Sequence, residues 1–249
     1  RGMDVGTTAP TAAERAEVPH HLVDLVNPTE DFTVSEFQVA ARRALDDMEG
    51  RGARAVLVGG TGLHVRAVVD DLEIPGRYDE VRAALDADDD TPGLYTRLAG
   101  LDPVAAGRME PTNRRRVVRA LEVTLGSGRP FSSFGPGLEA YPATPFTQVG
   151  LRVDREVLDR RIADRYRHQL ADGFLDEVRW LAALDGGPSR SAAQALGYSE
   201  LLAHLRGECT LADAIADAVV ATRRFARRQE RWFRRDPRIE WFDVGADPL

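Results

Sequence analysis

The sequence contains no lysine, so all 33 of its basic residues are arginine. The base composition of a genome can produce such a bias without any functional cause. The absence still has one consequence, because the phosphate-binding motif G-x-x-x-x-G-K-[ST] requires a lysine. That motif therefore does not occur within these 249 residues.

Cysteine is nearly absent too, since Cys209 is the only one. This excludes an internal disulfide and a cysteine-based metal cluster. His20 and His21 are adjacent and would point to opposite faces of a strand, so we expect no protein-bound metal. The sequence shows no signal peptide and no apolar run long enough to span a bilayer. We expect a cytoplasmic, soluble monomer without membrane contact.

Net positive charge is also lacking, because the formal net charge is −7. Any contact with nucleic acid must then come from local clusters of arginine. One cluster lies in Thr222–Arg235, where Arg223, Arg227, Arg231 and Arg235 recur every fourth residue and would form a stripe on a helix. A second lies in Asn113–Arg119, at the start of an expected helix. Arginine there opposes the helix dipole, which favours a bound polyanion over a solvated face.

A glycine-rich turn follows an apolar run. Ala55–Val58 leads into Gly59, Gly60, Thr61 and Gly62. A strand that ends in glycines and enters a helix forms a backbone cradle suited to phosphate. Many such turns need glycine for conformation alone and bind nothing. The hydroxyl of Thr61 could cap the helix, or it could touch a phosphate.

The order of expected elements predicts an α/β core interrupted by helices. We assign residues 1–75 and 146–249 to the core and residues 76–145 to a helical insertion. Residues 1–20 are expected to form a loop. Strands are expected at His21–Val26, Ala55–Val58, Phe146–Val153 and Ile239–Phe242. Helices are expected at 37–49, 63–69, 78–85, 94–98, 103–109, 113–125, 156–171, 175–184, 192–206 and 210–235.

Several segments, spread over almost the whole chain, resemble one known family, the tRNA dimethylallyltransferases. One such block would be weak, but their number and order make the resemblance specific. The segments are Arg1–Thr7, Pro19–Asp24 followed by Asn27, Pro28, Phe32 and Phe37, Val58–Leu63, Asp102–Ala106, Arg116–Val123, Gly173–Val178, Ala195–Tyr198 and Thr222–Trp232.

The resemblance implies a P-loop-kinase-like parallel sheet with a helical insertion that contacts tRNA. It also implies transfer of a dimethylallyl group from dimethylallyl diphosphate, with Mg²⁺, to N6 of adenosine 37, which lies 3′ of the anticodon. Thr61 would lie at the reaction centre, and Gly59, Gly60 and Gly62 would hold the diphosphate. The anticodon stem-loop would be bound by Arg82, Arg115, Arg116, Val117, Val118, Arg119, Arg223, Arg224, Phe225, Ala226, Arg227 and Arg228.

The sequence departs from the family pattern at several points. Ala9 replaces a usual lysine, His64 a usual tyrosine and Ser199 a residue that is often basic. The family's first strand, its lysine-containing P-loop and the aspartate proposed as general base lie before the equivalent of Arg1. We therefore expect an N-terminally truncated chain with little or no activity alone.

Other functions remain open at this stage. An adenylate isopentenyltransferase would use the same prenyl donor on a free nucleotide, but the insertion and the arginine stripe favour tRNA. A nucleotide kinase is disfavoured by the missing lysine. A non-catalytic RNA-binding remnant is the alternative outside enzymes. Glu122, Glu177 and Glu200 could serve as acids or bases, although helices carry glutamate routinely.

Overall fold

The structure, a computed structural model, describes residues 1–245 and divides into two compact units. The first comprises residues 1–65 and 145–249, and the second comprises residues 66–144. The second unit begins at residue 66, ten residues before the start expected at residue 76. It ends at residue 144, next to the end expected at residue 145. Among the described residues, no helix is long and apolar enough to cross a membrane.

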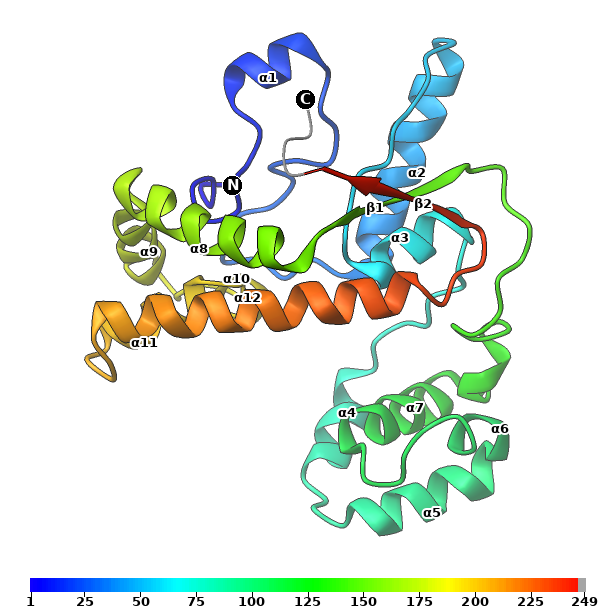
Figure 1. Cartoon of the computed structure of the whole chain (residues 1–249). Coiled ribbons are helices and arrows are strands. Elements are labelled where there is room, and N and C mark those ends of the chain that lie inside the picture. The colour runs from blue at the N-terminus through cyan, green and yellow to red at the C-terminus, as the bar shows by residue number, and fades with distance from the viewer. Residues whose placement is uncertain (246–249) are drawn as a thin grey trace. The chain divides into compact units, whose positions relative to one another are not determined.

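The core of the first unit is made by helices from the second half of the chain. They are α8 (Arg155–Ala171), α9 (Phe174–Ala182), α10 (Arg190–Ala193), α11 (Tyr198–Leu205) and α12 (Leu211–Phe233). α8 packs along α12 (Figure 1). The rings of Phe174 and Tyr198, both fully buried, meet edge to face with centroids 4.9 Å apart. The single helix expected at 192–206 is two helices, because Gly197 lies between them with φ +84°.

Two of the expected strands form the sheet of this unit. β1 (Gln148–Val153) pairs in parallel with β2 (Ile239–Val244), and Gly150 lies opposite Trp241. A Cβ atom at Gly150 would overlap the Trp241 ring, so glycine makes room for that side chain. The prediction of a parallel sheet is confirmed for this pair.

The other two expected strands were wrong. In His21–Val26, Leu22 and Asp24 have φ values of +63° and +57°, which interrupt an extended strand. Asp24 instead pairs with Arg15 at 2.7 Å. Ala55–Val58 is not assigned as a strand, and Val56 and Val58 are 85% and 86% exposed. A strand needs a hydrogen-bonded neighbour, and the described residues supply none for this run.

The N-terminal helices begin at capping boxes. They are α1 (Ala12–Glu17), in a segment wrongly expected to be a loop, and α2 (Val34–Gly50). The Thr11 hydroxyl accepts from the Glu14 N–H, and the Glu14 carboxylate accepts from the Thr11 N–H. Thr33 and Glu36 make the same reciprocal pair at α2. The pattern T-x-x-E at 11–14 is the signal that would have revealed α1.

The second unit is helical. It contains α4 (Asp79–Asp86), α5 (Thr91–Leu101), α6 (Pro103–Ala106), α7 (Arg114–Ser127) and the short 3₁₀ helix η1 (Phe131–Ser133). Its core includes Leu98, Val117, Val118 and Leu121, each fully buried. α3 (Gly62–Val69) crosses the division, which falls after Val65.

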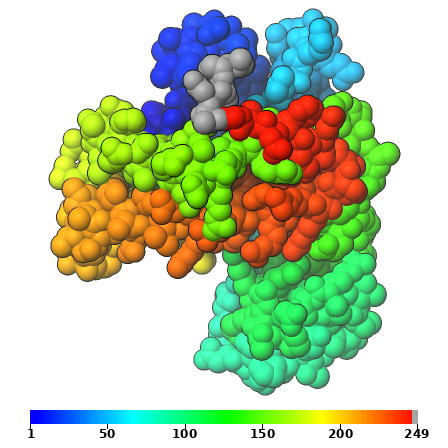
Figure 2. Space-filling view, in the orientation of Figure 1, coloured from blue at the N-terminus to red at the C-terminus, as the bar shows by residue number. Residues whose placement is uncertain are grey.

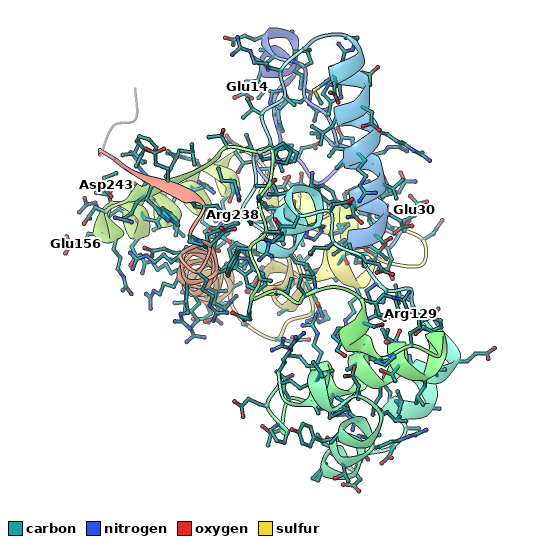
Figure 3. All side chains as sticks on the ribbon, turned by 90° about the vertical axis from the view of Figure 1, so that its right-hand side faces the viewer. Glu14, Glu30, Arg129, Glu156, Arg238 and Asp243 are labelled. Carbon is teal, nitrogen blue, oxygen red and sulfur yellow. The ribbon has the colours of Figure 1, made fainter. Side chains whose placement is uncertain are left out.

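Asp102 ties two parts of the second unit together. It is 2% exposed, caps α6 by accepting from the Ala105 N–H, and accepts from the N–H and hydroxyl of Ser132. Burial alone would raise the pKa of Asp102, but these hydrogen bonds together outweigh burial and lower it. At the edge of the same unit, Arg129, labelled in Figure 3, pairs with Glu73 at 3.1 Å.

Arg66 binds the segment around residues 138–141, near the C-terminal end of the second unit. It is 3% exposed and pairs with Asp70, while its guanidinium donates to the carbonyl oxygens of Leu138 and Ala140. The guanidinium also lies 4.6 Å from the centroid of the Tyr141 ring. A buried cation needs such partners to offset its lost hydration.

Candidate active site

The glycine-rich turn and the arginine-rich helix, far apart in sequence, are in contact. A Cβ atom at Gly60 would overlap the Gln229 side chain, and one at Gly62 would overlap the Trp232 ring. Gln229 and Trp232 belong to the C-terminal half of α12, which lies beside α3 (Figure 1). The two glycines therefore allow the turn to approach α12 more closely than any larger residue would.

The turn presents a group of unused backbone donors. The N–H groups of Gly60, Thr61, Gly62 and Leu63 donate to no acceptor within residues 1–245. The first intrahelical bonds of α3 run from the N–H groups of His64 and Val65 to the Thr61 carbonyl oxygen. Free N–H groups at the positive end of a helix dipole bind anions. This arrangement can receive a phosphate group.

Thr61 is exposed at the centre of this turn. Its hydroxyl makes no hydrogen bond to another described residue, so it is available to a ligand. His64, one turn into α3, stacks edge to face on Phe37 with ring centroids 5.0 Å apart. Its Nδ1 atom is buried and has no hydrogen-bond partner in the described chain. Burial lowers the pKa of His64 below the ordinary value.

The arginines of α12 divide into two groups. Arg223 turns inward, where its Nη2 donates to the Asp159 carbonyl oxygen at 2.9 Å. The others are exposed and make no salt bridge with any acidic residue in the described part of the chain, and Figure 2 shows this end of the helix at the surface. These exposed residues, the α12 arginine face, are Arg224, Arg227, Arg228 and Arg231.

The apolar residues that were expected to bind RNA instead contact other residues of the protein. Ala226 packs against the core of the first unit, and the Arg228 guanidinium lies 5.9 Å from the Phe225 ring centroid. Val117 and Val118 are fully buried in the second unit, so their side chains offer no surface to RNA. Val117 and Val118 lie four and three residues before Leu121, and this helical spacing of apolar residues is the signal that could have assigned them to the core.

The second unit carries its own arginines. Arg115 and Arg116 are exposed in the first turn of α7, and they make no ion pair with the described residues. Arg82 on α4 and Arg119 on α7 both lie near the buried carboxylate of Glu122. Of the arginines expected to contact tRNA in this unit, Arg115 and Arg116 thus make no ion pair with the described residues, whereas Arg82 and Arg119 lie beside Glu122.

Each of the three glutamates that could serve as an acid or a base accepts hydrogen bonds from backbone N–H groups. Glu122 accepts from the Tyr78 N–H, and Glu200 accepts from the Gly197 N–H. Glu177 accepts from the N–H groups of three consecutive residues, 4–6, and from the Tyr198 hydroxyl. Burial, then the hydrogen bond to Glu177, raises the pKa of Tyr198. Saturated carboxylates of this kind are poor candidates for proton transfer.

Solved structures define the class of the fold. A crystal structure of the full-length tRNA isopentenylpyrophosphate transferase from Bacillus halodurans matches 99% of this chain and 78% of its own, with 35% identity and a TM-score of 0.68. A eukaryotic dimethylallyltransferase described as acting on tRNA matches 97% of this chain and 64% of its own at 23% identity, with a TM-score of 0.78. The chain therefore has the α/β fold of these transferases, with a small parallel sheet and many helices.

Sequence comparison names the family. The tRNA dimethylallyltransferase of Pseudarthrobacter chlorophenolicus is 48% identical over 98% of this chain and 81% of its own length. That of Streptomyces coelicolor is 47% identical over 99% of this chain and 79% of its own. The family model described as IPP transferase matches residues 1–236. The chain belongs to the IPP transferase family and is a transferase.

The close approach of α3 to α12 predicts the effect of a single methyl group. Helix propensity alone would make Gly62→Ala stabilising by about 1 kcal/mol. Because the new Cβ would overlap the rigid Trp232 ring, we expect Gly62→Ala to be destabilising by about 1–3 kcal/mol in urea unfolding. Gly59→Ala is the matched control, since a Cβ there would meet only Val65 at 3.6 Å. Equal stability of the two variants would contradict this packing.

The buried imidazole predicts a dependence of stability on pH. The pKa of His64 is lowered in the folded state, so the unfolded chain binds the proton more readily. The contribution of His64 to stability is therefore present above about pH 6.5 and is lost as the pH falls below it. We expect His64→Phe to lose less stability than the wild type between pH 7.5 and 5.5, measured by urea unfolding. Parallel losses in both proteins would rule out this assignment.

Proposed function

We propose that this chain transfers the dimethylallyl group of dimethylallyl diphosphate to N6 of the adenosine 3′ of the anticodon, adenosine 37, in tRNA. The observation that carries the proposal is the set of unused N–H groups at residues 60–63, in contact with the arginine-rich end of α12. Membership of the IPP transferase family and the names of the relatives support the same reaction.

The residue types of the turn suit this chemistry. The N6 amine attacks C1 of the dimethylallyl group, the bond from C1 to the diphosphate oxygen breaks to release diphosphate, and the proton lost from N6 passes to water. Negative charge therefore grows on the departing diphosphate. Backbone N–H groups that are fixed in place before the reaction can stabilise such a charge without reorganising. We propose that the exposed hydroxyl of Thr61 donates to the same oxygens, and that Gly59, Gly60 and Gly62 bring no side chain of their own over the backbone N–H groups.

The arginines are proposed to hold the tRNA. An adenine can reach a prenyl carbon only after leaving its stack, and the enzyme must then hold the flanking phosphates. In a chain of net charge −7, exposed arginines without acidic partners are costly to place together without a polyanion. The α12 arginine face and Arg115 and Arg116 are proposed to contact the anticodon stem-loop, each within its own unit.

The described residues do not form a metal cage. No group of three or more His, Cys, Asp or Glu side chains in residues 1–245 is arranged to hold a metal ion. Mg²⁺ is therefore proposed only as the counter-ion that accompanies dimethylallyl diphosphate, and no step is assigned to it. A monomeric state and a cytoplasmic location remain predictions.

A transfer assay tests the reaction. With enzyme in excess over unmodified tRNA and labelled dimethylallyl diphosphate, we expect prenylated adenosine in the anticodon loop, identified by nucleoside mass spectrometry. Thr61→Val keeps the shape of the side chain and removes its donor, so we expect transfer about 10²-fold slower. Equal rates for both proteins would exclude the role of Thr61.

The same assay separates the alternatives. Faster transfer to adenosine monophosphate than to tRNA would identify an adenylate isopentenyltransferase. Saturable binding of tRNA without any product would contradict the proposed transfer and would favour an RNA-binding protein without chemistry.

The α12 arginine face predicts the salt dependence of tRNA binding. Each arginine that contacts a phosphate contributes about one unit to the slope of log K against log salt. We expect Arg224→Gln, Arg227→Gln and Arg228→Gln each to reduce the slope by about that amount. Arg206→Gln is the control, because Arg206 is already paired with Glu208 at 2.5 Å. A slope that is unchanged in all three α12 variants would remove this helix from the interface.

A further inference from the structure

The second unit contains a buried carboxylate that the proposed reaction does not use. Glu122 lies on α7, and its side chain is 4% exposed. Its Oε1 accepts from the Tyr78 N–H at 3.0 Å and from Nη1 of Arg119 at 2.6 Å, while Oε2 lies 3.6 Å from Nη1 of Arg82. A carboxylate in such a place is costly unless its partners are well arranged. Glu122 thus links two arginines from different helices.

Both arginines remain partly accessible and keep donors for a ligand. The side chain of Arg82 is 35% exposed and that of Arg119 is 29% exposed. Arg82 also donates from Nε to Asp86 at 2.7 Å, and Arg119 donates from Nη2 to the Pro75 carbonyl oxygen at 2.9 Å. Within residues 1–245, these contacts leave the Nη2 of Arg82 and the Nε of Arg119 without an acceptor. Arginine has five N–H donors in a rigid fork, so it can hold an acid and a phosphate together.

We propose that Glu122 is a positioning residue for RNA binding. Its buried carboxylate holds the guanidinium groups of Arg82 and Arg119 in fixed orientations, with their unused N–H donors directed to phosphates of the RNA backbone. The proposal rests on the proposed function, since it requires that the chain binds tRNA. A fixed arginine loses less side-chain entropy on binding than a free one, and this is the advantage that the buried acid provides.

Positioning and simple electrostatics predict opposite results when the acid is neutralised. Glu122→Gln removes one negative charge next to two cations. If the arginines act only as charges, RNA binding becomes tighter, because the local positive potential rises. If Glu122 positions them, binding becomes weaker, because an amide cannot hold two guanidinium groups as a carboxylate does.

The experiment measures binding of the whole chain to an unmodified tRNA anticodon stem-loop across a salt series. We expect Glu122→Gln to bind more weakly than the wild type and to lose up to about two units of the salt slope, one for each arginine. Asp79→Asn is the charge-matched control, since its side chain is 83% exposed and lies 3.8 Å from Arg77. We expect this control to bind as tightly as the wild type or more tightly.

A second measurement separates positioning from general loss of structure. In a chain that already carries Arg82→Gln and Arg119→Gln, adding Glu122→Gln should cause no further loss of binding, because the residues act together. If Glu122→Gln melts the second unit, Arg82→Lys carries the test. Lysine keeps the charge but lacks the fork, so weaker binding is expected.

The outcomes distinguish the two proposals. If the wild type, shown to be folded, does not bind the stem-loop, the proposed function fails. If the wild type binds, but Glu122→Gln binds as tightly with an unchanged slope, the positioning role is overturned. Unchanged binding by Arg82→Lys would overturn it as well.

Discussion

The contact between the glycine-rich turn and α12 is the constraint on which the first unit depends. At its N-terminal end α12 buries Ala214 and Ala218 in the helical core. At its C-terminal end it places Gln229 and Trp232 directly on Gly60 and Gly62. One helix of 23 residues therefore joins the packed core to the turn that carries Thr61. Any larger side chain at these glycines would separate the free N–H groups from the arginine-bearing helix.

The two candidate binding regions differ in how their arginines are paired within the described residues. The chain is acidic overall, yet the α12 arginine face makes no salt bridge within the described residues. In the second unit the arginines are paired, because Arg82 and Arg119 both lie within ion-pair distance of the Glu122 carboxylate. Free arginines can adapt to a flexible ligand, whereas held arginines give a fixed geometry. An RNA stem-loop has a flexible loop as well as a regular stem, so both kinds of contact suit it.

Much of the helical structure could be predicted from the sequence, because apolar periodicity and capping residues act over a few positions. The strands were harder to predict. Phe146–Val153 and Ile239–Phe242 were expected and pair with each other, but Ala55–Val58 has the same apolar character and no partner among the described residues. Local composition indicates that a segment can form a strand. Whether it does depends on a second strand elsewhere in the chain.

The candidate site shows the same division. The sequence alone was enough to find the glycine turn with Thr61, the arginine clusters and the resemblance to a family, because these depend on residue types and short spacings. Only the tertiary structure decided that the turn touches Gln229 and Trp232, that Arg223 faces inward, that Val117 and Val118 are core, and that Glu122 binds two arginines. Helical spacing places these residues on faces, but the packing of neighbouring helices determines which face is buried. That packing depends on contacts between residues far apart in the chain, and no local pattern records them.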